Sequence, residues 1–410
     1  MRKIAWVLLL IFAFAIPWEN SLDSGEPLGN VGRITGLLLL LVAVPAILQA
    51  GRVRTPGLMQ WLVLALFVWF CCSYFWTVEP NATLEKIRGY FQEMMLVWLV
   101  WEFAESPLDL RALLRAFVAG SWVLALLTLA NFSSSAAIAE GQIRFAATGQ
   151  DPNDVARFLD LGFPLAALLP NGEERWLGKL LALGYLPVGL VAVLLTASRG
   201  GALAALVALA GCVILLMRGH ARWVIAGLFA LPAIVAALWF SVPHETFERL
   251  ATIPEQVQRG DLNQRINIWS AGWDAFLRTP LFGSGAGSFV SAAGLNSIDT
   301  AHNTALSILV GGGLCAFFLA VTVVAAAARA MMKTRGALRL ALATALLVWA
   351  ITSLVATVEE SRTTWLLLGM IALAGRLAVE DPVQLEACFV SASREPRYAM
   401  GCDPMPEAGR

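Results

Sequence analysis

The chain has 410 residues, of which 58% are hydrophobic and only 14% are charged, and its formal net charge is zero. A soluble domain carries about 25% charged residues, so this composition excludes a globular protein whose whole surface faces water. The balanced charge also gives no indication of a nucleic-acid partner.

The apolar runs predict an all-α polytopic membrane protein. A helix needs about 20 apolar residues, within a range of about 17–25, to cross the hydrocarbon core of a bilayer. The first run follows Arg2 and Lys3 and resembles a signal peptide, but it lacks a clear small-x-small cleavage site, so we expect a retained helix. Breaks at glycine, proline and charge clusters give about twelve spans, at residues 4–17, 33–50, 58–76, 84–103, 111–131, 154–170, 178–196, 201–217, 222–241, 302–328, 337–357 and 363–379.

The charge of the loops predicts the orientation of these spans. With the N-terminus inside, every inside loop has at least two basic residues, whereas most outside loops are acidic or mixed. Lysine and arginine prefer cytoplasmic loops. We therefore expect helices 1–9 in residues 1–241, a periplasmic loop at 242–301, helices 10–12 in 302–379, and a cytoplasmic tail at 380–410. Both termini then lie in the cytoplasm.

The segment 242–301 is the only long loop, and long loops in compact proteins are usually functional. Asp261 can begin a helix that runs to about Arg278 and ends before Pro280. Apolar residues recur in it three or four positions apart, at Ile266, Trp269, Trp273 and Phe276. Such a helix either lies in the membrane interface or packs on the bundle. The polar tail from Glu380 onward is predicted to be disordered.

Three residues of the predicted outer face are candidates for chemistry. Arg199 lies in a very short hairpin (TASRGG), where its planar guanidinium suits a diphosphate headgroup or pairs with lipid phosphate without specificity. Arg265 lies one turn before Trp269 and either contacts phosphate or is simply solvated. His302 stands where the long loop meets the tenth span, and it either accepts a proton from a sugar hydroxyl or caps the helix.

Other polar motifs remain open to two interpretations. Asp151 and Asn153 precede the sixth span, where they form a turn and helix cap or hold a cation. Arg157 and Asp160 follow three positions apart, so one helix face can pair them. Glu359 and Glu360 lie in the last outside loop, where a carboxylate could orient His302 or bind an acceptor.

The glycine-rich stretch at 281–289 (LFGSGAGSF) also has two interpretations. Loops of this kind let backbone N–H groups approach phosphate. No strand precedes the stretch and no lysine follows it, so we interpret it as a tight return from the loop helix.

Taken together, these segments resemble the O-antigen ligase and polymerase family of bacterial membrane proteins. The ordered motifs that carry the resemblance are 16–20 (IPWEN), 149–154 (GQDPND), 196–200 (TASRG), 265–269 (RINIW), 280–285 (PLFGSG) and 301–303 (AHN).

The resemblance implies a twelve-span helical fold of the inner membrane with a periplasmic active site. It implies a glycosyltransferase that takes a glycan from undecaprenyl diphosphate and, in the ligases, joins it to a sugar hydroxyl of lipid A-core without a metal or other cofactor. Arg199 and Arg265 take the family's diphosphate-binding roles and His302 that of the base. Glu359 or Glu360 stands where the family often has an aspartate, and Asp151 and Asn153 are further supporting candidates.

Within the family, the sequence does not decide between a ligase and a polymerase, which share the donor chemistry and differ in the acceptor; we favour the ligase. A protein-glycosylating ligase is a third option, but such ligases often carry a larger C-terminal part, whereas this tail is short. Two other classes stay as alternatives: a lipid-linked glycan transporter, and a scaffold subunit without catalysis. The two halves of the chain differ and carry few charges inside the spans, which counts against a transporter built from two similar halves.

Overall fold

The computed structural model describes residues 1–22, 30–134, 144–172, 175–219, 265–296 and 300–390, with five single residues between 219 and 265. Within these residues the chain forms α-helices and two short 3₁₀ helices, and no strand occurs in this part of the molecule. The prediction of an all-α polytopic membrane protein is therefore confirmed.

Fourteen α-helices belong to the described residues. In chain order they are α1 (Arg2–Ala15), α2 (Val31–Ala50), α3 (Leu58–Cys72), α4 (Pro80–Phe103), α5 (Pro107–Ser133), α7 (Pro152–Leu168), α8 (Trp176–Leu195), α9 (Arg199–Gly219), α13 (Arg265–Arg278), α14 (Phe289–Ala293), α15 (Thr304–Lys333), α16 (Gly336–Ser353), α17 (Arg362–Glu380) and α18 (Pro382–Cys388). The 3₁₀ helices are η1 (Ile16–Leu22) and η2 (Ser73–Phe75).

Eleven of the twelve predicted spans coincide with a helix, with differences of a few residues at their ends. The ninth, at 222–241, lies outside the described residues apart from two single positions, and Asp261 also lies outside them. Among the described helices, nine are long and apolar enough to cross a membrane. The helices α4 and α7 are not among these nine: α4 carries five charged residues, and α7 is only 17 residues long.

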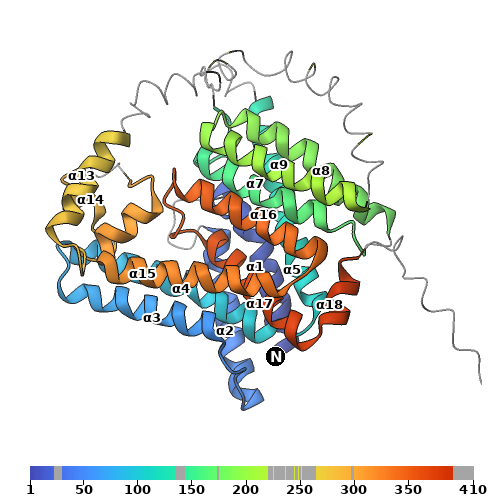
Figure 1. Cartoon of the computed structure of the whole chain (residues 1–410), viewed down its shortest axis with the longest axis horizontal. Helices are drawn as coiled ribbons and strands as arrows, with labels where there is room; N and C mark the ends of the chain where they lie inside the picture. Colours follow the sequence, from blue (N-terminus) through green and yellow to red (C-terminus); the bar gives the residue numbers. More distant parts are fainter. Residues whose placement is uncertain are drawn as a thin grey trace, which may run out of the picture.

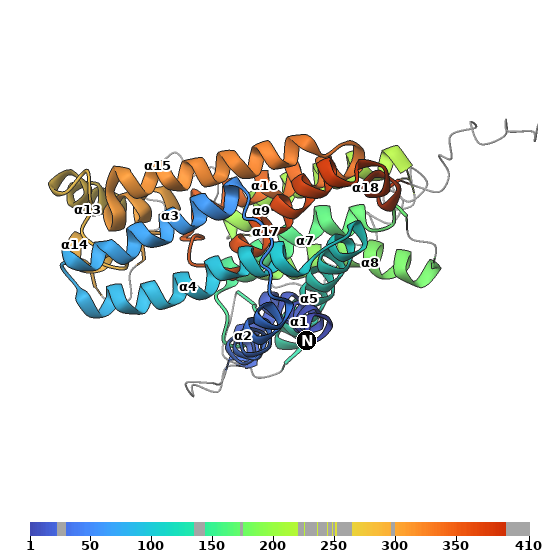
Figure 2. The ribbon, with the colours of Figure 1, turned by 90° about the horizontal axis from the view of Figure 1, so that it is seen from below.

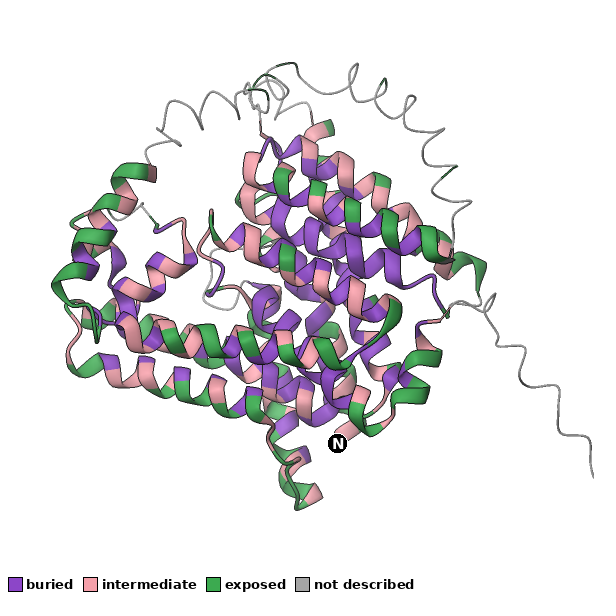
Figure 3. Cartoon of the chain, in the orientation of Figure 1, coloured by how far each residue is buried: buried purple, intermediate pink, exposed green. Residues whose placement is uncertain are grey.

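The helices α3, α4 and α15 run side by side along the longest direction of the molecule, whereas α1 and α2 run across this direction (Figures 1 and 2). The molecule therefore has two ends along the direction of α3, α4 and α15. The helices α13 and α14 lie at one end, beside the ends of α3, α4 and α15, and α18 lies at the opposite end. We call these the α13 end and the α18 end. Buried residues gather along α7 and α17 in the interior, whereas α2 and α3 carry many exposed residues (Figure 3).

The exposed faces of the outer helices are apolar. On α2, Leu41 and Leu48 are 61% and 75% exposed. A contiguous surface of this kind is unfavourable in water but is the ordinary surface of a helix in lipid. The exposed apolar faces of the outer helices thus agree with the low fraction of charged residues in the sequence.

The C-terminal region differs from its prediction. A helix, α18, replaces the disorder expected after Glu380, and it packs against α5 and α17. The buried guanidinium of Arg111 donates to the carbonyl oxygens of Leu169 (2.6 Å), Asn171 (2.7 Å) and Cys388. This clamp fixes α18, so the prediction of disorder is wrong for residues 382–390, while 391–410 lie outside the described residues.

Candidate functional site

The hairpin that carries Arg199 is tightly held at the α13 end. Only three residues separate α8 from α9, and Arg199 is the first residue of α9. The backbone N–H of Phe145 donates to the carbonyl of Leu195 (2.9 Å), and Arg144 Nε donates to the carbonyl of Thr196 (3.2 Å). These bonds from a distant segment fix the position of the Arg199 backbone.

The segment before α7 supports the same hairpin. Asp151 is the N-cap of α7, and its carboxylate accepts from the N–H of Asn153 (2.7 Å), which confirms the prediction of a turn and cap. Asn153 Oδ1 accepts from Ser198 Oγ and from Arg144 Nη2, both at 2.9 Å. Asn153 therefore positions the residue next to Arg199 and has its oxygen engaged by protein donors, which disfavours the cation interpretation.

Arg265 lies at the first described position of α13 and is partly buried. Burial lowers the pKa of this guanidinium, the nearby positive charge of Arg199 lowers it further, and Asp151 acts in the opposite direction. Two like charges held in a partly desolvated space oppose each other unless an anion lies between them. The fold therefore brings together the two arginines that the sequence had selected.

The position of α13 tests the two predictions for its apolar stripe, which were the membrane interface and packing on the bundle. Helix α13 packs on α15 with Trp269 and Phe276, while Ile266 and Trp273 are 42% and 49% exposed. Packing on the bundle thus accounts for half of the predicted stripe. The helix ends at Arg278, as predicted from Pro280.

His302 lies two residues before the start of α15 but does not cap it. The N-cap is Asn303, whose Oδ1 accepts from the N–H of Leu306 (2.9 Å), so the capping interpretation of His302 is wrong. Trp269 Nε1 donates to the carbonyl of Ala301 (3.0 Å), which ties the turn to α13.

The turn at His302 also lies close to the Arg199 hairpin. Asn303 Nδ2 donates to the carbonyl of Leu354 (3.2 Å). A Cβ built on Gly200 would stand 2.9 Å from Cγ2 of the next residue, Val355. Leu354 thus contacts the residue after His302, and Val355 contacts the residue after Arg199. These two adjacent residues link the two motifs.

The backbone is strained at two places in this region. Among the described residues, Ala197 (φ 49°) and His302 (φ 46°) are the non-glycine residues with positive φ. This left-handed conformation costs an L-residue about 1–3 kcal/mol and concentrates at functional sites. Both residues belong to motifs that carry a candidate side chain.

The structure distinguishes the two glutamates of the loop between α16 and α17. Glu360 pairs with Lys86 at the surface. Glu359 is 6% exposed, and its carboxylate makes no hydrogen bond of standard geometry among the described residues, although the Ser307 side chain lies near enough to act on its pKa. Burial raises the pKa of Glu359 to about 7, with a further contribution from the charge of Glu360, while Ser307 and Lys86 act in the opposite direction.

Glu359 is tied to the His302 turn through Thr304. Thr304 Oγ1 donates to the carbonyl of Ala356 (2.9 Å) and accepts from the N–H of Val358 (2.8 Å). Glu359 is therefore the better supporting candidate, because the carboxylate of Glu360 is already paired with Lys86.

Arg157 was not selected from the sequence as a site residue. It pairs with Asp154 (2.9 Å), not with Asp160 as expected, and both carboxylate oxygens of Asp160 are buried without a hydrogen bond in the described part of the chain. Arg157 interacts electrostatically with Glu359 and Asp151. Its Nε and Nη1 are buried and have no hydrogen-bond partner among the described residues. Charged residues within a predicted membrane span were the available signal.

The glycine-rich stretch follows α13 as a return turn, as predicted, and it also contacts α15 through backbone hydrogen bonds, which was not predicted. Helix α15 is interrupted at Gly313 (φ 67°). The N–H groups of Ser284 and Gly285 donate to the carbonyls of Val310 and Gly311, and the N–H of Leu314 donates to the carbonyl of Pro280. These backbone groups are satisfied within the protein, so they form no phosphate cradle.

Comparison with protein families gives one match. Residues 185–321 match the family described as O-antigen ligase. The match confirms the resemblance to this family over 137 of the 410 residues. Comparison with curated proteins gives no match.

The matched segment contains Arg199, Arg265 and His302, whereas Asp151, Asn153, Glu359 and Glu360 lie outside it. The finding and the helices together identify a bacterial multi-pass membrane protein related to O-antigen ligases and polymerases.

Proposed function

We propose that this membrane protein of O-antigen ligase type transfers a glycan from undecaprenyl diphosphate to a sugar hydroxyl of lipid A-core. The observation that carries the proposal is the convergence of Arg199, Arg265 and the His302 turn at one end of the bundle. Their side chains come from three segments that are distant in the sequence. In this proposal the α13 end faces the periplasm and both termini lie in the cytoplasm.

The proposed reaction is a direct displacement. The diphosphate of the donor lies against Arg199 and Arg265, and His302 takes the proton of the acceptor hydroxyl. The hydroxyl oxygen forms a bond to the anomeric carbon as the bond from that carbon to the diphosphate oxygen breaks. Undecaprenyl diphosphate leaves with the electron pair, and the anomeric centre inverts. The proposal requires no metal ion or other cofactor.

The two arginines stabilise the leaving group in this scheme. Preorganised donors of this kind contribute about 2.7–4 kcal/mol each to transition-state stabilisation. Glu359, buried behind the His302 turn, is the proposed group that stabilises the protonated imidazole. Asp151 and Asn153 act by holding the hairpin and the Arg265 charge in place.

The test uses purified protein in detergent with lipid-linked glycan and lipid A-core, and measures the coupled product by mass spectrometry. His302→Asn removes the imidazole but suits the left-handed backbone, and we expect a loss of roughly 100-fold or more. Transfer at the wild-type rate in this variant would remove His302 from the mechanism.

The arginine test has a matched control on the same helix. Arg265→Ala should slow transfer roughly 100-fold. Arg278→Ala removes an exposed arginine that lies thirteen residues after Arg265, at the end of α13, and whose Nη2 donates to the carbonyl of Ala292 in α14. This substitution should leave the rate unchanged. Equal effects of the two substitutions would indicate general loss of charge instead of diphosphate binding.

A deletion strain distinguishes the ligase from the related polymerase. Loss of all long-chain lipopolysaccharide with an intact core supports the ligase, whereas capping by a single repeat unit supports the polymerase. Transport of lipid-linked glycan across proteoliposomes, without transfer to the acceptor, would instead favour the transporter.

A further inference from the structure

Helix α13 has an apolar side that the bundle does not cover. Ile266, Trp273 and Leu277 are 42%, 49% and 56% exposed. They stand seven and four positions apart, so they lie along one line of the helix, which we call the apolar side. The bundle packs against a different side, on which Gly272 and Phe276 are buried.

A third side of α13 is polar. Asn267, Asp274 and Arg278 are exposed and also stand seven and four positions apart, so they form a second exposed line, the polar side. A helix whose exposed surface faces only water is polar over that whole surface. Exposed apolar and polar lines on one helix are typical of the membrane interface, where one line meets lipid and the other meets water.

The direction of α13 also suits the membrane interface. The helix runs at a steep angle to α3 and α4, beside their ends (Figures 1 and 2). Its 14 residues are too few to span a bilayer. Helix α13 therefore lies over one membrane surface, at the end of the helices that cross the membrane.

Aromatic side chains mark the membrane interface beside α13. At the α13 end of α3, Tyr74 and Phe75 are 40% and 86% exposed, and tyrosine and tryptophan gather where lipid meets water. Trp76 Nε1 donates to the carbonyl of Phe282 (3.2 Å), and the Phe282 ring stacks on Trp69 with centroids 5.7 Å apart. Because Phe282 follows the end of α13 by four residues, these contacts join α13 to the aromatic belt of a lipid-facing helix.

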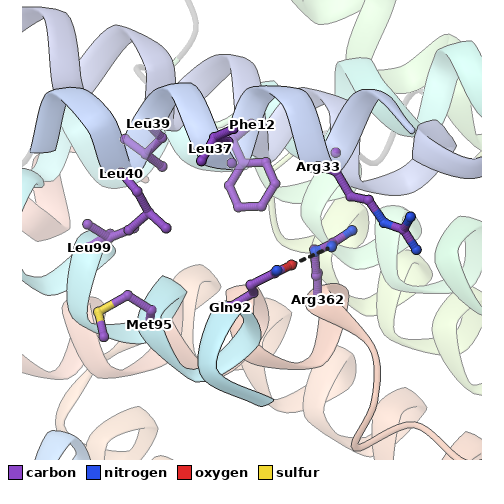
Figure 4. Close-up of a pocket in the computed structure, with 11 residues that line it drawn as sticks. Phe12, Arg33, Leu37, Leu39, Leu40, Gln92, Met95, Leu99 and Arg362 are labelled. Carbon is purple, nitrogen blue, oxygen red and sulfur yellow. Dashed lines mark hydrogen bonds between the residues drawn. The ribbon is translucent and has the colours of Figure 1, made fainter. Parts of the chain in front are cut away.

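A hollow between α1, α2 and α4 offers no comparable contact with lipid. It is lined by Phe12, Leu40 and Leu99, and at its polar end Gln92 Oε1 accepts from Arg362 Nη2 at 3.1 Å (Figure 4). Its volume is about 80 Å³, which is room for a few water molecules. The hollow is too small for the isoprenoid chain of the proposed donor, whereas the apolar side of α13 is open.

We propose that the apolar side of α13 lies in the outer leaflet of the bilayer and holds Arg265 at the depth of the lipid phosphates. The inference rests on the proposed function for the orientation and for the ligand of Arg265. Arg265 stands seven positions before Gly272, on the bundle side, where it interacts electrostatically with Arg199. An interfacial helix is buried about 5–10 Å into the boundary between headgroups and acyl chains. A lipid-linked diphosphate lies at this boundary, so the donor reaches both arginines without leaving the leaflet.

Spin labels measure the environment of α13 without catalysis. In a cysteine-free background, Ile266→Cys and Trp273→Cys place a nitroxide on the apolar side. The matched controls Asn267→Cys and Asp274→Cys place one on the polar side, one position further along. The full chain is reconstituted in vesicles of phosphatidylethanolamine and phosphatidylglycerol. Relaxation by oxygen, which partitions into lipid, is compared with relaxation by a water-soluble nickel complex. The ratio of oxygen to nickel relaxation should be several-fold higher on the apolar side than on the polar side.

Two results would overturn the proposal in variants that keep the wild-type thermal unfolding midpoint. The first is nickel relaxation on the apolar side as strong as on the polar side, because the apolar side would then face water. The second is a label on the apolar side that neither reagent reaches, because protein from this chain or from a second copy would then cover this side.

Kinetics test what the lipid contact does for the donor. The double substitution of Trp273→Gln and Leu277→Gln should raise KM for a donor embedded in vesicles roughly tenfold. KM and kcat for a donor with a shortened isoprenoid chain in detergent should stay at the wild-type values, because no bilayer takes part. Asp274→Asn, on the polar side, is the control and should behave like the wild type in both assays.

The two assays separate this inference from the proposed function. An equal rise of KM in vesicles and in detergent would mean that the apolar side acts on the site itself, and it would reject the role of the leaflet. Spin labels that report lipid contact in a protein that transfers no glycan would reject the proposed reaction and retain the membrane contact of α13.

Discussion

Glu359 illustrates what burial does to one side chain at this site. Its carboxylate is enclosed without a hydrogen bond of standard geometry among the described residues, and its pKa is raised to about 7 from an ordinary value of 4.5. In the unfolded chain it ionises near the ordinary value. Between these two pH values the folded protein binds one more proton than the unfolded chain, so the free energy of unfolding falls as pH rises through this window.

This pH dependence yields a prediction for Glu359→Gln. Because the amide does not ionise, the variant should gain roughly 2–3 kcal/mol of stability relative to wild type between pH 5 and pH 8. Thermal unfolding of the two proteins in detergent at both pH values measures the difference. Glu85→Gln removes an exposed carboxylate and is the control. A gain that is the same at both pH values would contradict the burial argument.

At the same scale, the sequence selected candidate residues but could not assign their partners. Arg199, Arg265 and His302 stood out because charged groups are rare in this chain and lie at predicted helix ends. The choice between Glu359 and Glu360 depends on which one reaches Lys86, and the pairing of Arg157 depends on the rotamer it adopts on α7. Both are contacts that spacing along the chain does not encode.

At the scale of the elements, the interruption of α15 has the clearest consequence. A Cβ at Gly313 would stand 2.3 Å from the carbonyl oxygen of Leu281, at a positive φ. Gly313→Ala must displace the glycine-rich loop that completes the helix, and it should destabilise the protein by roughly 3 kcal/mol.

Gly294→Ala is the matched control for Gly313→Ala. Gly294 has nearly the same φ, 66°, but open space around it. Only the cost of the left-handed backbone applies there, about 1–2 kcal/mol. Thermal unfolding midpoints of the two variants should therefore differ clearly. Equal losses would mean that the close approach to Leu281 contributes nothing.

Hydropathy predicted the long helices well because lipid imposes a length and a polarity on each of them. It did not predict the break in α15, since the apolar run continues through Gly313 and the break depends on bonds from residues 280–285. It also missed α18, whose stability comes from Arg111 on a distant helix. Helices whose length and polarity are set by the lipid bilayer were predictable from the sequence. The break in α15 and helix α18, which depend on tertiary contacts, were not.

At the scale of the whole molecule, the orientation in the membrane is the property to test. In a cysteine-free background, Leu281→Cys places a thiol at the α13 end and Val383→Cys places one at the α18 end, at positions that are 57% and 77% exposed. An impermeant maleimide added to intact spheroplasts should label the first and spare the second. Labelling of the second alone would place the candidate site in the cytoplasm.

The indole bond from Trp269 to the carbonyl of Ala301 joins two parts of the molecule with different tasks. One carries the arginine proposed to hold the departing diphosphate, and the other carries the imidazole proposed to accept the proton. If α13 shifts to admit or release a lipid while this bond persists, both groups travel together. Arg265 and His302 would then enter or leave the catalytic arrangement together, so that neither group acts on a bound lipid without the other.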